Sequence, residues 1–247
     1  MSRPLPVTIM VRRTAALAGA LALVVSLAGC IGGSPAGTPP SDAVSPTPTP
    51  TPESTPTAQP VDPLTTVVGL VARPEGLELR DVGGTVLATI DYMSSPADAV
   101  GALTTVFDEP PVDEPYAGTN HHPGGVFHTW DQFVLDERFY DEQRRQANGY
   151  DWLVWPRLAV YFDGPAADGV VLSTSSGLQA GDSWSDARSD PGFDDELWTC
   201  TGTSVEAVTI GAPDGSEDRA NVVVMPTADG ATVKWIGAPE MEAEGCA

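Results

Sequence analysis

The three histidines of the chain, His121, His122 and His128, lie within eight residues, and Asp131 follows closely. Histidine is the commonest metal ligand among side chains, and zinc sites with three histidines are known. Two adjacent histidines on a loop diverge, however, and Pro123-Gly124-Gly125 indicates a turn at this place. We therefore keep the three histidines as a weak candidate metal site and expect a polar surface loop without a cofactor.

Other patterns that carry enzyme chemistry are missing from the sequence. It contains neither His-Glu-x-x-His nor Gly-x-Ser-x-Gly, and no glycine-rich phosphate loop. Acidic pairs such as Asp136-Glu137 occur, but among 34 acids a catalytic pair does not stand out. A further acidic group lacks the spacing of a calcium-binding loop: Asp190, Asp194, Asp195 and Glu196. We predict no catalytic residues and a non-enzymatic protein.

The N-terminal segment has the pattern of an export signal. Basic residues precede an apolar run from Ala15 to Ala28, about 14 residues, whereas a membrane-spanning helix needs about 20. The run ends in Leu27-Ala28-Gly29-Cys30, which resembles the lipobox of bacterial lipoproteins. The resemblance implies cleavage before Cys30 and a diacylglyceryl group on its thiol. Two acyl chains give stable anchoring, here to the outer, extracytoplasmic face of the cell membrane.

Three points about this segment stay open. The alternative to a lipoprotein is an ordinary secretory signal peptide with an unrelated cysteine. Translation could start at Met1 or at Met10, and Arg12-Arg13 leaves export by the twin-arginine route open.

The next segment, residues 30–63, differs in composition. Ten of the 33 residues from Ile31 to Pro63 are proline, and most others are Ser, Thr, Ala or Gly. Such a stretch cannot bury a core, so we expect a disordered tether. In an extended polyproline II conformation it would reach roughly 100 Å at about 3.1 Å per residue. It would act either as a spacer through a cell wall or as a linker of no particular length.

The charge of the chain excludes several classes of partner. Residues 1–29 hold three of the twelve basic residues and none of the 34 acids, so the rest has nine bases and a net charge of −25. A surface this acidic repels nucleic acid and anionic lipid headgroups. Lys234 is the single lysine beside eleven arginines, a bias that resembles proteins of high-GC Gram-positive bacteria.

Besides Cys30, the sequence has two cysteines, Cys200 and Cys246. In an oxidising compartment this even pair predicts a disulfide. The closed loop of about 46 residues would contribute roughly 4 kcal/mol in the chain-entropy model. Six tryptophans are also present, and Trp152 and Trp155 could form an exposed platform for sugars, although core packing is the ordinary role of tryptophan.

Residues 64–247 are long enough for one domain with a real core. Its segments 67–72, 77–80 and 86–92 predict a three-stranded meander, with a hairpin turn at Gly83-Gly84. Ser95 and Pro96 predict the start of a helix with an apolar face up to Phe107. Three strands are expected after it: 126–139, 158–163 and 170–174.

A similar order then follows. Ser183-Trp184-Ser185-Asp186-Ala187 has the Ser-x-x-Asp-Ala form of Ser95-Pro96-Ala97-Asp98-Ala99 and predicts a second capped helix. Three more strands are expected: 205–210, 221–225 and 232–236. The fold class is therefore α+β, mainly antiparallel sheet with few short helices, arranged as two helix-plus-three-strand repeats. This order loosely resembles the tandem repeats of the beta-lactamase inhibitor protein, and no functional residue is carried over.

Taken together, the sequence predicts a lipid-anchored cell-envelope protein whose domain is a binding or accessory module. Its expected partners are the membrane, through Cys30, and an envelope protein or a cell-wall component. Two alternatives stay open: a metal-dependent envelope enzyme and an inhibitor-like protein-binding module.

Overall fold

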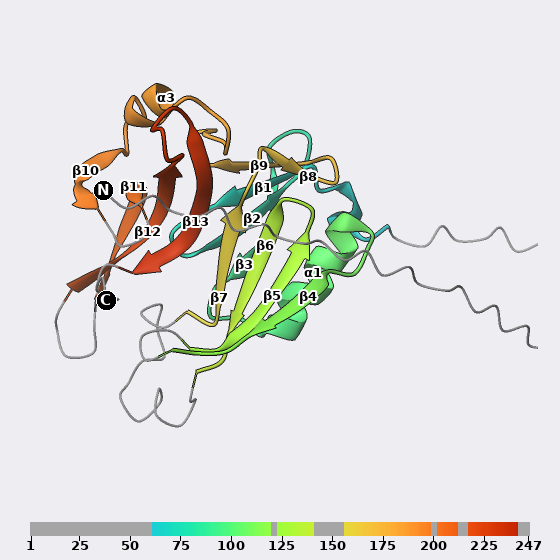
Figure 1. Ribbon diagram of the computed structural model, residues 1–247. Coiled ribbons are helices and arrows are strands. Elements are labelled where there is room, and N and C mark those ends of the chain that lie inside the picture. The colour runs from blue at the N-terminus through green and yellow to red at the C-terminus, as the bar shows by residue number, and fades with distance from the viewer. Residues whose placement is uncertain (1–60, 120–122, 141–155, 199–201, 212–216, 242–247) are drawn as a thin grey trace, which may run out of the picture. The chain divides into compact units, whose positions relative to one another are not determined.

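The computed structural model describes residues 61–119, 123–140, 156–198, 202–211 and 217–241, without the side chains of 196–198, 211, 217 and 218. The chain divides into two units, Met1–Pro56 and Thr57–Ala247, and all described residues belong to the second. Its described strands form two sheets, of five and of eight strands (Figure 1).

The five-stranded sheet has the order β3-β2-β1-β9-β8. Its first three strands are the expected meander, and Gly84, with φ 79°, lies in the turn between β2 and β3. Strand β9 pairs with β1 in parallel, whereas β8 pairs with β9 in antiparallel fashion. The strand bounds are β1 Gly69–Ala72, β2 Gly76–Arg80, β3 Val86–Asp91, β8 Ala166–Ala167 and β9 Val170–Thr174.

The eight-stranded sheet has the order β10-β11-β12-β13-β7-β6-β5-β4, and all its neighbours are antiparallel. It consists of two four-strand meanders that join through β7 and β13, where Tyr161 pairs with Gly237. The first meander comprises β4 Val112–Tyr116, β5 Gly125–Trp130, β6 Phe133–Arg138 and β7 Leu158–Phe162. The second comprises β10 Asp194–Trp198, β11 Thr203–Gly211, β12 Glu217–Pro226 and β13 Val233–Met241.

Both expected helices are present, one before each meander. Helix α1, Pro96–Phe107, has Ser95 at its N-cap position and Pro96 as its first residue. Helix α3, Trp184–Arg188, is capped by the Ser183 side chain, which accepts a hydrogen bond from the Asp186 amide at 3.1 Å. A short 3-10 helix, η1, spans Pro63–Thr66. None of the described helices is both long enough and apolar enough to cross a membrane.

One apolar core joins α1, the inner face of the five-stranded sheet and one face of the eight-stranded sheet. Phe107 of α1 contacts the rings of Trp130 and Phe133, whose centroids lie 5.4 and 5.7 Å away. Because side chains alternate along a strand, these contacts define the inner face of the eight-stranded sheet.

The expectation of a mainly antiparallel, sheet-rich fold is confirmed, but three details of the strand assignment were wrong. Residues 126–139 form two strands, because the chain turns at Asp131, which adopts φ 47°. Six strands follow α1 and four follow α3, where three were expected each time, because β4, β8 and β10 were missed. Residues 170–174 form β9, which belongs to the other sheet, where it pairs with β1.

Candidate functional site

The eight-stranded sheet has a second face, opposite the core, which we call the outer face. A row of paired residues crosses it from β4 to β13: Val112, Thr129, Val134, Tyr161 and Gly237. Val112 is 73% exposed, and the side chains of Thr129, Val134 and Tyr161 are partly exposed. The row is therefore exposed at Val112 and partly exposed at its three middle residues, whereas Gly237 is buried.

Aromatic rings lie over two glycines of the outer face. A Cβ atom at Gly237 would stand 2.9 Å from the Trp235 ring and 3.1 Å from the Tyr161 ring, which meet edge to face. A Cβ atom at Gly125 would stand 2.8 Å from the Tyr116 ring, which stacks on Phe127 at 4.5 Å. A Cβ atom at either glycine would thus overlap an aromatic ring, and at Gly125 it would also overlap the Glu137 carbonyl at 2.1 Å.

A buried polar group adjoins the Tyr116 ring. Asp136, 4% exposed, accepts hydrogen bonds from the Tyr116 hydroxyl at 2.7 Å and from Arg138 Nε at 2.9 Å. Arg138 also donates to the Tyr161 hydroxyl at 3.3 Å. Burial, and then the Asp136 carboxylate, raise the pKa of Tyr116, and burial raises that of Tyr161. Both phenols are therefore neutral hydrogen-bonding groups.

His128 lies on the opposite, inner face and is 7% exposed. Its Nδ1 lies 2.7 Å from Asp113 Oδ1, and its Nε2 lies 3.1 Å from Glu137 Oε2. Both contacts are hydrogen bonds only when each ring nitrogen carries a proton. The two carboxylates lie at opposite sides of the ring, so they do not converge on one point, as the ligands of a zinc ion would.

The side chains of the acidic pair Asp136-Glu137, noted in the sequence, lie on opposite faces of the sheet. Asp136 belongs to the outer face with Tyr116, whereas Glu137 contacts His128 on the inner side. Adjacent residues of β6 point to opposite faces, so the two carboxylates cannot act on one substrate.

The remaining metal candidates do not come together in the described part of the chain. No group of three His, Cys, Asp or Glu side chains among the described residues could hold a metal ion. His121 and His122 lie outside the described residues. Asp131 is an exposed turn residue, and Asp190 accepts from the Gly192 amide at 2.8 Å and from the Ser176 hydroxyl.

Several other predicted residues lie outside the described residues and are not placed. They are Cys30, Cys200, Cys246, Trp152 and Trp155.

The two sheets are connected by a polar network that sequence reasoning missed. Arg73, after β1, donates to Glu78 of β2 at 3.0 Å and to Glu206 of β11 at 2.8 Å. Glu206 also accepts from Ser175, which follows β9. Since 133 residues separate Arg73 from Glu206 in the chain, no local sequence signal could reveal this pair.

Tyr92 lies close to this network and is fully buried. Its hydroxyl is the one fully buried side-chain polar atom among the described residues that has no hydrogen-bond partner. The nearby Arg73 amide already donates to the Gly76 carbonyl at 3.0 Å. Burial raises the pKa of Tyr92 far above its ordinary value.

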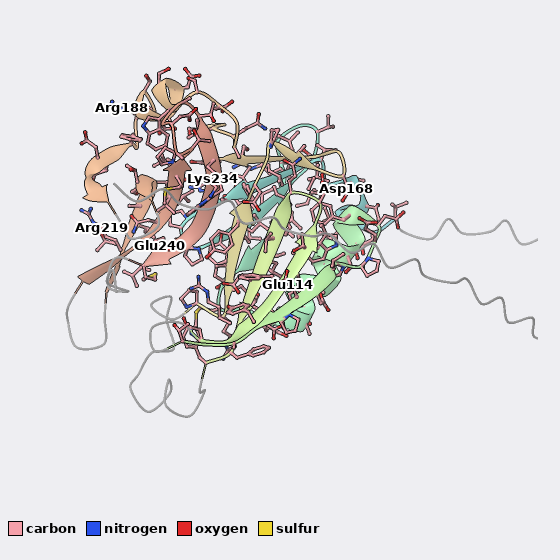
Figure 2. All side chains as sticks on the ribbon, in the orientation of Figure 1. Glu114, Asp168, Arg188, Arg219, Lys234 and Glu240 are labelled. Carbon is pink, nitrogen blue, oxygen red and sulfur yellow. The ribbon has the colours of Figure 1, made fainter. Side chains whose placement is uncertain are left out.

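Side chains of every kind cover the described strands (Figure 2). On the outer face, apolar and aromatic side chains from several strands meet without a described helix against them. Comparison of the chain with known protein families, with curated proteins and with solved structures gives no match.

Proposed function

We propose that this protein is a lipid-anchored module of the bacterial cell envelope, which binds a protein or wall component through the outer face of its eight-stranded sheet. The anchor is a diacylglyceryl group on Cys30, and residues 31–63 form the tether. The domain is non-enzymatic and serves as a binding or accessory module at the extracytoplasmic side of the cell membrane.

The row from Val112 to Tyr161 is the observation that carries this proposal. Core contacts account for the inner face of the sheet, where α1 packs on Trp130 and Phe133. They do not account for aliphatic and aromatic groups that four strands present together on the other face. Apolar and aromatic groups that remain partly exposed over several neighbouring strands are typical of binding sites, and tyrosine and tryptophan are enriched in them.

The arrangement of elements supports a finer architecture, which is also part of the proposal. Each helix precedes a four-strand antiparallel meander, and the last strands of the two meanders pair with each other. We take the domain as α+β with two tandem repeats of one helix and four strands. Two repeats joined in this way double the width of the available face, which suits an inhibitor-like or scaffold-like binding module.

Site-specific photocrosslinking in the cells that produce the protein tests the proposal. A benzoylphenylalanine at Val112 should capture a partner, because this side chain is 73% exposed at the end of the row. The matched control is Val171, which is 47% exposed on the five-stranded sheet. Its neighbours in sequence, Val170 and Leu172, are buried, so Val171 points away from the core.

We expect a discrete crosslinked product at position 112 that is lost in the variant Val134→Asp and absent at position 171. Equal products at positions 112 and 171, or none at 112, would contradict binding by the outer face. Circular dichroism of Val134→Asp serves as the folding control.

A further inference from the structure

We propose that the partner of the outer face is a protein with a cationic contact surface, attracted by acidic residues that border the apolar row. This inference rests on the proposed function and specifies the chemistry of the partner.

Acidic side chains share the outer face with the apolar row. Glu114 of β4 is exposed and has the same orientation as Val112, two residues before it. Asp163 is exposed and follows β7, two residues after Tyr161, and the exposed Asp131 lies in the turn between β5 and β6, two residues after Thr129. Three acidic residues thus lie within two positions of residues of the row.

The basic residues of this region are fewer and largely engaged. Arg138 is 10% exposed and binds Asp136. Lys234 of β13 is exposed, but it lies near the Asp163 carboxylate (Figure 2 labels Lys234 and Glu114). Glu114, Asp131 and Asp163 thus outnumber Lys234, so this region keeps an excess of negative charge, as does the chain as a whole, with −25 after residue 29.

Charge complementarity decides among possible occupants of this face. A second copy of the same acidic chain would bring like charges together, and these repel across an interface. Anionic wall polymers and lipid headgroups are repelled in the same way. A cationic protein surface is attracted at long range, and its apolar centre would then bury the row from Val112 to Tyr161.

Charge reversal at the border, combined with the crosslink at position 112, tests this inference. The test variant is Glu114→Lys with Asp163→Lys. The control variant is Glu75→Lys with Asp168→Lys, which changes the net charge equally at exposed sites, after β1 and between β8 and β9. Both double variants leave the apolar row intact.

We expect the border reversal to lower the crosslink yield about tenfold or more, and the control reversal to leave it within about twofold. The captured protein, identified by mass spectrometry, should have a positive net charge in its crosslinked domain. The inference would be overturned if both variants gave equal yields or equal losses. It would also be overturned if the captured product were an acidic protein, a glycan or a lipid, although binding by the outer face would then still stand. Absence of any product at position 112 would overturn both.

Discussion

At the scale of single residues, the Tyr92 hydroxyl is a polar group that the fold buries without a partner. A buried hydroxyl that lacks a hydrogen bond costs about 1–3 kcal/mol. Its ring, in contrast, is a fully buried part of the core. We therefore expect Tyr92→Phe to raise the free energy of unfolding by about 1 kcal/mol, measured by urea denaturation.

The matched control is Tyr116→Phe, because the Tyr116 hydroxyl donates to the buried Asp136. This variant should lose about 1 kcal/mol, since Asp136 then keeps one fewer donor. A loss of stability in Tyr92→Phe equal to that in Tyr116→Phe would show that the Tyr92 hydroxyl has a partner, such as an internal water.

The pH dependence of the free energy of unfolding, compared between the unchanged protein and Tyr92→Phe, gives a second measure of the burial of this hydroxyl. Burial raises the pKa of Tyr92 above 10.0, its ordinary value. The unfolded chain then releases the tyrosine proton first, so the folded state loses stability as the pH rises above about 10. This loss should be smaller in Tyr92→Phe than in the unchanged protein.

His128 shows why spacing along the chain says little about the neighbours of a histidine in the fold. The three histidines lie within eight residues of the sequence, and this spacing made them a candidate metal site. In the fold, β5 turns His128 towards two carboxylates, on β4 and β6, that no local pattern links to it. The sequence also contained Asp113 and Glu137, but only strand register makes them neighbours of His128.

At the scale of elements, local signals explain what could be predicted. Helix α1 was predictable because Ser95, Pro96 and the apolar face up to Phe107 all lie within its own segment. Strand β4 was missed because its five residues, all but Tyr116 exposed and one of them Pro115, show no apolar alternation. The parallel pairing of β9 with β1 joins residues about a hundred positions apart, for which the sequence has no signal.

The outer face could not be predicted for a related reason. Alternation along one strand tells which residues share a face, but the row across the sheet depends on the order and register of several strands. In the sequence, Gly125 and Gly237 indicate only positions where a strand is less stable, because glycine has no side chain to pack. In the fold, an aromatic ring lies beside each glycine: Tyr116 of the neighbouring strand beside Gly125, and Trp235 of the same strand and Tyr161 of the neighbouring strand beside Gly237.

The predicted disulfide belongs at this scale, because the described strands β11 and β13 flank the two cysteines, which themselves lie outside the described residues.

We predict that the exported domain contains a Cys200–Cys246 disulfide. Its intact mass should be about two units below the reduced mass, and Cys200→Ser should lower stability by roughly 4 kcal/mol, because an open chain of about 46 residues gains entropy on unfolding. Cys246→Ser is the matched control and should cause the same loss. Two alkylatable thiols in the denatured, non-reduced protein would disprove the bond.

At the scale of the whole molecule, the acidic charge and the proposed anchor act together. A chain with a net charge of −25 after residue 29 is repelled by anionic headgroups, so it would not remain at a membrane by its own surface. A diacylglyceryl group supplies two acyl chains, at about 0.8 kcal/mol per buried CH₂ group, and overcomes this repulsion. A tether of roughly 100 Å in extended form would then place the domain beyond the repulsive layer, since charges are screened over about 8 Å at physiological salt.

The variant Cys30→Ala tests this account, because it removes the thiol that would carry the lipid and leaves the apolar run from Ala15 to Ala28 unchanged. We expect the unchanged protein to enter the detergent phase on partitioning and the variant to appear in the aqueous phase, or as a longer, uncleaved precursor. Cys200→Ala is the matched control and should still enter the detergent phase, because a disulfide contributes nothing to membrane affinity. If Cys30→Ala remained in the membrane fraction with its N-terminus processed normally, something other than lipid on Cys30 would hold the protein there, and its acidic surface would then have to face a cationic partner at the membrane itself.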